Sequence, residues 1–600
     1  MEKVTLKQLI FASLNLFNKT PSNESLCLVT EDNDFTTWEN VFTSGIIMSP
    51  KLINEYVVDY IRENIMFDAN ATFYNSFDEV ISKRRLELFI DQILHYATTY
   101  GTDYTEEPFI VKDINIEFDI TKHIIFSEIT REELIEKCLN MLSANIGLKE
   151  ETLRDIFNIL TYYDAIPADN SNINNREAKI MYYILTDTKP SKAEDIIRYV
   201  HFLTTKNTMI VKNDLLFLQL KHSNFDCSEL FENSDLKEHA KIFNRYKKVY
   251  LGIKHANENN KKYINKISKL SKKYHEPKGK PWIETILDSV DVFNELHDKL
   301  PNMSNFKKIQ LIETIRRRRL QLPISMYVIR NQKVFVKNET PKYEEWYSVL
   351  EDILYSSLIE SLKLKNDKTI KLNDIVDITL PTSEKSFIGN YPIGSKVNFN
   401  DDDVIVGINW RGEDGAQDLD LSYIDRKGNK IGWNSSYYDD EKNIIYSGDM
   451  TSANPEATEC LYASNGFNDG IVNVNIYGSR NGNIPFKLFL AKEKPSNFKR
   501  NYMVNPNNIL EVFNLELDIR QAVVGVLYNN SFILAKLNSG NGWVSNGMGN
   551  PDIMKFIIEN DSCKLTLEEV LTDAEFSFVE NNADIDFSNV DKSTLLELFK

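Results

Sequence analysis

The stretch "QDLDLSYIDRKGNKIGW", residues 417–433, decides how the C-terminal part of the chain is expected to fold. Acidic and apolar side chains alternate along it, and a strand places residues i and i+2 on one face. The stretch therefore predicts a strand whose apolar face packs inward and whose other face carries two carboxylates. The apolar face holds Leu419, Leu421 and Tyr423, and the polar face holds Asp418, Asp420 and Ser422.

Short strands punctuated by Gly and Asn surround this stretch and predict an antiparallel β-sandwich over residues 385–545. Past about residue 385 the hydrophobic period changes from helical to alternating. A helical and acidic extension is expected at 546–600. The strands are expected at 404–410, 470–478, 486–493, 521–529 and 531–538.

Residues 1–320 are expected to be mostly α-helical, which makes the chain an α+β multidomain protein. One segment, "SKAEDIIRYVHFLTT", opens with Ser191 and Glu194, the spacing of a capping box. Short helices with short polar joints favour stacked helical hairpins, as in HEAT-like arrays, although no fixed repeat period is found. Residues 321–384 are expected to form a hairpin and a helical connector.

Composition is that of a globular multidomain chain, with 600 residues, 42% apolar residues and a net charge of -18. No apolar run is long enough to cross a bilayer, so membrane insertion is not expected. The N-terminus lacks the apolar core and cleavage site of a signal peptide. The five cysteines are widely separated, which argues against a disulfide framework and against CxxC zinc ligation. A reducing cytoplasm is the expected compartment.

The acidic strand face and the loop that follows it predict a site for a hard divalent cation. Two carboxylates about 7 Å apart along a strand can lean toward one ion held about 2.4 Å from each oxygen. Clustered carboxylates with exposed carbonyls favour Ca²⁺ over Mg²⁺. No histidine follows His297, which argues against zinc, copper or non-haem iron in the sandwich. The candidate ligands are Asp418, Asp420, Ser422, Asp439, Asp440, Ser447 and Asp449.

The acidic stretch has two other interpretations. An EF-hand loop that began at Asp418 would place Tyr423 at its sixth position and Asn429 at its twelfth. An EF-hand requires Gly and Glu at those positions, so this motif is excluded. Acidic surface loops are common and most bind nothing, so the spacing alone leaves a solvated strand face as an equal alternative.

Three segments, in chain order, resemble the TerD-type tellurium-resistance and stress-response family. The resemblance covers about residues 390–540 and implies a β-sandwich that binds Ca²⁺ through its aspartates, in a bacterial or phage stress or defence setting. Gln417 and Tyr446 stand where that family typically has Phe and His. The segments are "YPIGSKVNFNDDDVIVGINW", "QDLDLSYIDRKGNKI" and "IIYSGDMT", in which Gly407, Trp410, Asp418, Asp420, Ser422, Ser447, Gly448 and Asp449 fill the family's positions.

Residues 235–282 are strongly basic, with about fourteen Lys and Arg against about four acids. Lysines interleaved with aromatic residues are typical of proteins that bind single-stranded nucleic acid, which makes RNA a candidate partner. Apolar residues at core spacing, among them Ile264 and Ile267, favour instead a solvated helix face. The helical array is similar only in architecture to the Ro ribonucleoprotein (TROVE) family. The candidate contact residues are Lys261, Lys262, Lys272, Lys273, Tyr263 and Tyr274.

No sequence motif indicates catalysis, since GxSxG, HExxH and GxxxxGK[ST] are all absent. His95 and His201 lie among apolar neighbours and are expected to pack within helices. The four arginines at 316–319 cannot all face one partner, because consecutive helix residues are about 100° apart, so some are expected to pair with acids of neighbouring helices. The sequence therefore predicts a Ca²⁺-binding scaffold protein that is not an enzyme. An RNA-binding scaffold is the alternative, and a protein partner is left open.

Overall fold

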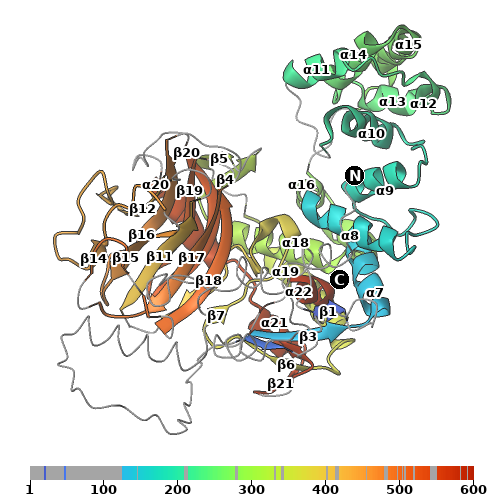
Figure 1. Cartoon of the computed structure of the whole chain (residues 1–600). Coiled ribbons are helices and arrows are strands. Elements are labelled where there is room, and N and C mark those ends of the chain that lie inside the picture. The colour runs from blue at the N-terminus through green and yellow to red at the C-terminus, as the bar shows by residue number, and fades with distance from the viewer. Residues whose placement is uncertain are drawn as a thin grey trace, which may run out of the picture. The chain divides into compact units, whose positions relative to one another are not determined.

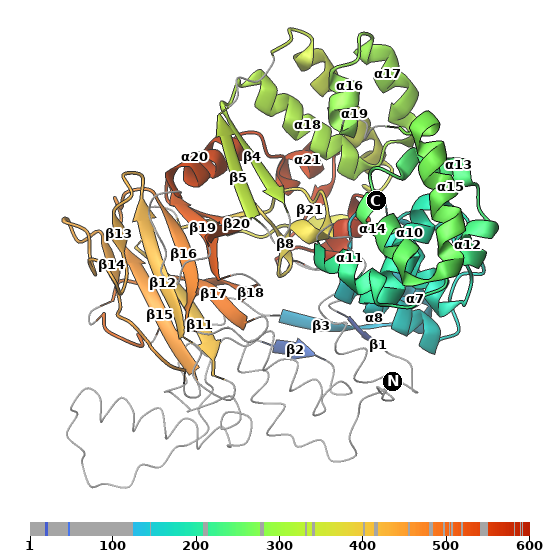
Figure 2. The same ribbon diagram turned by 90° about the horizontal axis from the view of Figure 1, so that it is seen from above.

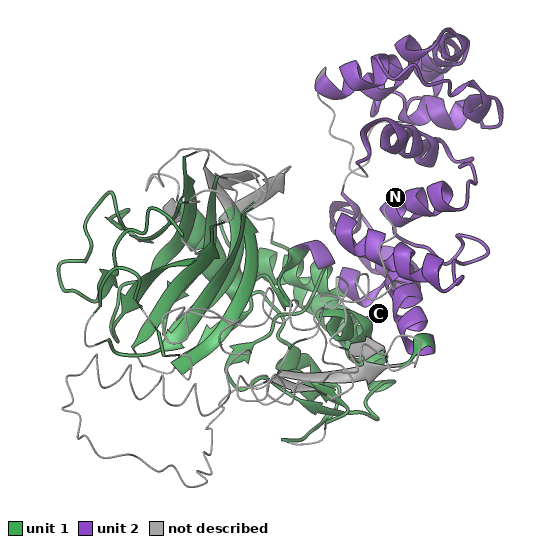
Figure 3. Cartoon of the chain, in the orientation of Figure 1, with its two compact units in different colours: residues 1–131, 308–382, 386–599 green, residues 132–307, 383–385, 600 purple. Residues whose placement is uncertain are grey.

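The chain folds into two compact units in the computed structural model (Figures 1 and 3). Unit 1 comprises residues 1–131, 308–382 and 386–599, and unit 2 comprises residues 132–307, 383–385 and 600. The structure describes residues 19–21, 46–48, 124–144, 146–207, 214–276, 281–329, 333–338, 343–399, 403–412, 418–453, 456–478, 484–495, 498–502, 504–505, 508–517, 520–540, 550–580, 583–588, 590 and 592–600.

Unit 2 is built from helices that pack on one another (Figure 1): α9 lies against α8 and α10, whereas α11 packs mainly on α14 and α13 mainly on α15. Fully buried side chains such as Ile196, Ile253 and Ile264 form a core between them. The helical character predicted for the N-terminal region is confirmed for the described residues from Arg131 onward, whereas the described pieces before them, at 19–21, 46–48 and 124–129, are strands. The helices are α7 (Arg131–Ser143), α8 (Glu150–Tyr162), α9 (Arg176–Leu185), α10 (Ala193–Thr205), α11 (Asp214–Lys221), α12 (Ser228–Glu232), α13 (Leu236–Ile242), α14 (Lys247–Ala256), α15 (Glu258–Tyr274), α16 (Trp282–Leu287) and α17 (Val292–Lys299), followed by the 3-10 turn η5 (Leu300–Asn302).

The start of α10 differs from the capping box that the sequence indicates. The helix begins at Ala193, and its N-cap residue, Lys192, makes no side-chain capping hydrogen bond. Glu194 instead accepts a hydrogen bond from the Tyr246 hydroxyl at 2.8 Å and forms an ion pair with Arg176. The Glu194 carboxylate is therefore engaged by residues of other helices, and it does not form the predicted capping box.

A short segment distant in sequence completes unit 2 at the start of α8. Glu384 is fully buried, and its carboxylate accepts hydrogen bonds from the Lys149 amide and the Thr152 hydroxyl, each at 2.6 Å. One donor is the backbone N–H of the N-cap residue, and the other is a side-chain hydroxyl in the first turn of the helix. Glu384 thus anchors the start of α8, where Lys149 makes no side-chain capping hydrogen bond.

Unit 1 contains the β-sandwich, whose two antiparallel sheets lie face to face (Figures 1 and 2). The larger sheet has the strand order β13-β12-β16-β19-β20-β10-β7, and the smaller has the order β14-β15-β11-β17-β18. The predicted antiparallel sandwich is confirmed. The strands are β7 (Val376–Asp377), β10 (Lys396–Asn398), β11 (Val404–Arg411), β12 (Asp418–Asp425), β13 (Lys430–Ile431), β14 (Ile444–Tyr446), β15 (Glu456–Ala463), β16 (Gly470–Tyr477), β17 (Ile484–Lys492), β18 (Ile509–Leu517), β19 (Gln521–Tyr528) and β20 (Ser531–Gly540).

Further elements of unit 1 accompany the sandwich. The hairpin expected after α18 is formed by β4 and β5, and β5 pairs in parallel with β20. Helix α20 packs on the larger sheet through Ile553 and Met554. The elements are α18 (Asn305–Arg319), β4 (Ile324–Ile329), β5 (Lys333–Asn338), α19 (Tyr347–Lys363), α20 (Asn550–Asp561), α21 (Leu567–Asp573), α22 (Lys592–Leu598), η6 (Glu384–Ser386) and the short strands β1 (Lys19–Pro21), β2 (Ile46–Met48), β3 (Ile124–Ile129), β6 (Thr369–Lys371), β8 (Phe387–Ile388), β9 (Tyr391–Pro392), β21 (Ser577–Phe578) and β22 (Ile585–Asp586).

The arginine run pairs with acids of neighbouring helices, as the sequence predicts. Arg316 and Arg319 of α18 both donate to the Glu351 carboxylate of α19 at 2.8 Å, and Arg316 also reaches Glu569 of α21. His201 is buried in α10, with its Nδ1 2.9 Å from the Asn207 carbonyl oxygen. His95 lies outside the described residues. A search of the described helices finds none that could span a membrane.

An aromatic ring covers a strand glycine in the smaller sheet. Gly407 of β11 pairs directly with Phe489 of β17. A Cβ atom added to Gly407 would lie 2.1 Å from the Phe489 ring, well inside van der Waals contact. Only glycine therefore fits at this position without displacing the ring.

We expect Gly407→Ala to lower the free energy of unfolding by about 1–3 kcal/mol, the usual cost of overpacking a core. Urea unfolding of the full chain, followed by tryptophan fluorescence, measures the change, since Trp410 is buried on the same strand. In a Phe489→Leu background the same substitution should cost clearly less, because the ring is gone. Equal costs in the two backgrounds would contradict this packing.

Candidate metal centre

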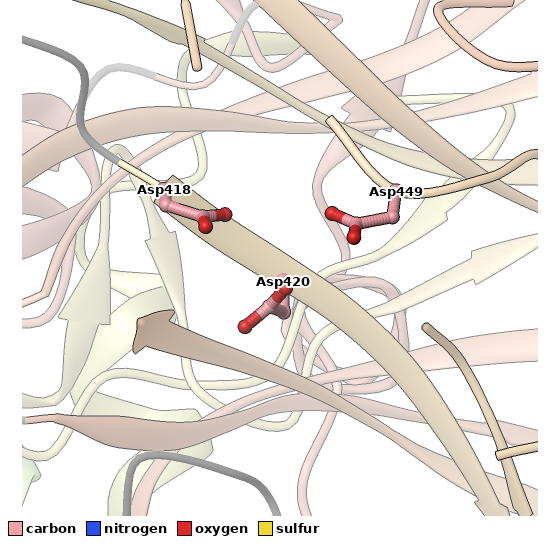
Figure 4. A group of neighbouring side chains, drawn as sticks. All are labelled: Asp418, Asp420 and Asp449. Carbon is pink, nitrogen blue, oxygen red and sulfur yellow. The ribbon is translucent and has the colours of Figure 1, made fainter. Parts of the chain in front are cut away.

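Three aspartates from two segments of the sandwich meet at one place (Figure 4). Asp418 and Asp420 project from the start of β12, and Asp449 points toward them from the connection between β14 and β15. One carboxylate oxygen from each residue lies within 4.8 Å of the other two. Asp420 is buried, and the other two are partly buried.

Local hydrogen bonds position the aspartates. Asn475 of β16 stands directly opposite Asp420, and its Nδ2 donates to Asp420 Oδ2 at 2.6 Å. Before Asp449, Ser447 both donates its N–H to the Cys460 carbonyl and accepts from the Cys460 amide through Oγ, each at 2.9 Å. Gly448 then takes a φ of +120°, a conformation that favours glycine, and the chain turns back toward β12.

The carboxylate of Glu459 links the two segments that carry the aspartates. Its Oε2 accepts a hydrogen bond from the Leu421 amide at 2.7 Å, and its Oε1 accepts one from the Met450 amide at 2.8 Å. Leu421 follows Asp420 in the chain, and Met450 follows Asp449. Glu459 is fully buried on β15, so it is a fixed brace between β12 and the loop that carries Asp449.

Burial and mutual repulsion raise the pKa values of the three carboxyl groups. Burial, with the charge of Asp449 added, raises the pKa of Asp418 to about 6. Burial and the charge of Asp418 raise the pKa of Asp420 to about 7, although the hydrogen bond from Asn475 acts in the opposite direction. Burial also raises the pKa of Asp449, against the attraction of Arg500. Near neutral pH the group therefore holds protons that a cation could displace.

One lysine lies beside the carboxyl groups. Burial lowers the pKa of Lys430 to about 8, and the charge of Asp420 opposes this shift. The ammonium group also donates to the side chain of Asn434. Together, Lys430 and Arg500 offset only part of the negative charge that the three aspartates carry when ionised, so their repulsion persists.

The residues fit a hard divalent cation of the size of Ca²⁺. Oxygens bound to one Ca²⁺ at about 2.4 Å lie at most about 4.8 Å apart, which the three aspartates satisfy. The Oδ1 atoms of Asp418 and Asp449 are buried and accept no hydrogen bond from any described residue. A buried carboxylate oxygen without a partner is unfavourable, and a cation would satisfy it. Because Ca²⁺ takes six to eight oxygens, waters or carbonyls would complete the shell.

Of the other predicted ligands, Asp439 and Asp440 do not join this group of carboxylates. Ser422 lies fully buried farther along β12, opposite Asn473. The Ser447 hydroxyl is engaged by the Cys460 amide, as described above. Asp439 accepts from the Ile444 amide at 3.0 Å, and Asp440 is exposed in the same turn before β14. Of the seven predicted ligands, three aspartates are therefore brought together.

Sequence reasoning did not select Glu459 or Asn475 as part of the site. In "VNVNIYG", Asn473 and Asn475 alternate with apolar residues, and both are fully buried in the larger sheet. The burial of Asn475 follows from the position of β16 between β12 and β19, which the local sequence does not show. On β15, Glu459 stands between Thr458 and Cys460, and its burial likewise follows from tertiary packing.

The basic segment forms helices α13 to α15, and its predicted contact residues differ in accessibility. Lys262, Lys272 and Lys273 are exposed, whereas Lys261 is half-buried and forms an ion pair with Glu258. The Tyr263 ring is buried in the helical core, stacked against Phe231. Tyr274 is partly buried, with the ammonium groups of Lys237 and Lys273 over its ring at 5.8 and 5.2 Å from the centroid. Tyr263 therefore does not offer a surface for base stacking.

Comparisons with known proteins identify no relative: no protein-family model, no curated protein and no solved structure matches the chain. The resemblance to the TerD-type family stays a prediction that rests on the residues quoted for it. The same holds for the likeness in architecture to the TROVE family.

The raised pKa values predict how stability depends on pH when cations are removed. Aspartates of an unfolded chain have a pKa near 4, so between about pH 4 and pH 7 the folded protein binds more protons than the unfolded one. Stability from these groups is therefore lost as pH rises through this window. Asp420→Asn removes the titrating group but keeps an oxygen for Asn475. In EGTA we expect the variant to be more stable than the wild type at pH 8, by up to a few kcal/mol.

Urea unfolding of both proteins in EGTA at several pH values between 5 and 8 measures this difference. Titrating groups that do not interact with Asp420 cancel in the comparison, because they are common to both proteins. The charges of Asp418, Asp449 and Lys430 interact with that of Asp420, so the difference reports the coupled group. The advantage of the variant should shrink as the pH falls toward 5. A difference that stays constant across the pH range would contradict the burial and repulsion inferred for Asp420.

Proposed function

We propose that this chain is a Ca²⁺-binding protein that holds the ion through Asp418, Asp420 and Asp449. The observation that carries the proposal is the convergence of three carboxylate oxygens within 4.8 Å, with buried oxygens that no described residue satisfies. The order of the matching segments in the TerD-type resemblance is the second support. Carboxylate oxygens without histidine or thiol donors favour a hard cation over a transition metal.

The chemistry of such a site is binding and crosslinking. An ion bound at this place joins β12 of the larger sheet to the β14–β15 connection of the smaller sheet. Because Glu459 already fixes both segments, little conformational entropy would be lost on binding. We propose a cytoplasmic scaffold in bacterial or phage stress response or defence; this setting comes from the family resemblance alone.

Calcium titration of the full chain tests the proposal. Saturation at about 100 times the dissociation constant should add about 2.7 kcal/mol to the free energy of unfolding. The double variant Asp418→Asn with Asp420→Asn should abolish both the heat of binding in calorimetry and the stabilisation. Wild-type protein that unfolds identically in EGTA and in millimolar Ca²⁺ would refute the proposal.

The chain offers a matched control for this titration. Asp439→Asn with Asp440→Asn makes the same change of charge on the adjacent turn, outside the group of three carboxylates. We expect this variant to bind Ca²⁺ like the wild type. If the control also lost binding, general negative charge rather than the three aspartates would be responsible.

Glu459→Gln tests the brace. The amide would place one N–H group against the Leu421 or Met450 amide, both of which are donors. We expect Ca²⁺ affinity to fall about 10- to 100-fold, the usual effect of disturbing the residues that orient metal ligands. Calorimetric titration measures the affinity, and circular dichroism checks that the variant is folded. Unchanged affinity in a folded variant would show that Glu459 does not position the site.

A further inference from the structure

Helix α15 carries a row of lysines on the side opposite its buried face. Four of them follow the spacing i, i+4, i+7 and i+11, which places them on one face of a helix. All four are exposed, and their span along the axis is about 16 Å at 1.5 Å per residue. Two of them, Lys266 and Lys269, were not among the contact residues predicted from the sequence. The lysine row consists of Lys262, Lys266, Lys269 and Lys273.

Acidic residues do not neutralise the lysine row. Residues 259–275 contain no Asp or Glu. The nearest acids in the sequence pair with other lysines: Glu258 with Lys261, and Glu238 and Glu276 with Lys241. Among the described residues, none forms an ion pair with the four lysines of the row. The row therefore presents positive charge to solvent.

The core of unit 2 holds the lysine row in place. Asn260 of α15 is fully buried, and its Oδ1 accepts from the Cys227 amide at 2.8 Å. Its Nδ2 donates to the carbonyl oxygens of Phe225 and Ile253 at 2.9 and 3.0 Å. Ile264 and Ile267 pack in the same core as helices α10 and α14. The helix is thus a rigid support on which the lysine spacing is fixed.

We propose that the lysine row docks the phosphate backbone of duplex nucleic acid without reading its sequence. A duplex presents ordered phosphates at high charge density, which a fixed row of ammonium groups matches. A single strand would lose conformational freedom on binding and would gain little from stacking, because Tyr263 is buried and Tyr274 lies beneath two lysines. The burial of Tyr263 thus shifts the expected ligand from single-stranded RNA to a duplex.

Two other features of the chain bear on the choice of partner. The apolar face of α15 is already buried in the core, so the helix has no free apolar face to insert into a membrane. The net charge of -18 does not prevent binding, because exposed charges beyond about 8–10 Å are largely screened at physiological salt. Local charge on α15 therefore governs contact with a polyanion.

Fluorescence anisotropy of the full chain with labelled 20-base-pair duplexes tests the proposal. EGTA in the buffer keeps the result independent of Ca²⁺ binding. Four neutralised phosphates give a slope near -3.6 in a plot of log K against log salt, which is a loss on the order of 100-fold between 50 and 200 mM salt. Two duplexes of unrelated sequence should bind with equal affinity. Separate titrations with duplex DNA and with duplex RNA compare the two backbones.

The decisive variant changes all four lysines of the row to glutamine. We expect it to bind at least tenfold more weakly at 50 mM salt and to lose most of the salt dependence. A control changes four other exposed lysines to glutamine, with the same change of charge, and should bind like the wild type. The control lysines are Lys427, Lys494, Lys499 and Lys555.

Several outcomes would overturn the proposal. These are an absence of duplex binding at 50 mM salt, a row variant that binds like the wild type, and a control variant that loses binding equally. Tighter binding to a single-stranded oligonucleotide than to the duplex would restore the single-strand interpretation, especially if Tyr274→Ala weakened it. Binding to phosphatidylserine vesicles without duplex binding would identify a membrane surface instead.

Discussion

The hydrogen bonds from the Leu421 and Met450 amides to the buried carboxylate of Glu459 are the interaction on which the acidic site depends. Burial raises the pKa of Glu459 well above its ordinary value, and the two N–H donors act against that shift. An ionisable group in the core is unfavourable unless it is well hydrogen-bonded. Here the hydrogen bonds join two sheets at the two points from which Asp420 and Asp449 project, so the fold itself holds like charges together.

Like charges gathered in this way conflict with local stability, and such conflicts are expected at functional sites. Asp418 and Asp420 share one strand face, where adjacent carboxylates repel, and Asp449 approaches them from the other sheet. Asn475 and Lys430 relieve part of this repulsion without removing it. A fold that served stability alone would separate the three carboxylates. Their convergence is therefore the feature of the sandwich that most needs a functional explanation.

The sequence predicted those features that depend on local pattern. Alternation placed Asp418 and Asp420 on one face of β12, and helical spacing identified Ile264 and Ile267 as core residues. The sequence pattern did not predict burial that is decided by tertiary packing. Asn475 was not selected but lies buried beside Asp420, and Tyr263 was expected to contact nucleic acid but is buried in the helical core. No local pattern indicates which buried polar atoms will meet across two sheets, which is why Glu459 was not selected.

The acidic site and the lysine row differ in the sign of their charge and in their exposure to solvent. The carboxylates lie in a partly desolvated place, where weak screening makes each interaction strong and shifts pKa values. The lysines stand in water, where screening weakens each one and several must act together. Site-directed charge changes should therefore act locally in the sandwich and collectively on α15. For this reason the average charge of -18 describes neither feature, and the two have to be explained from their own surroundings.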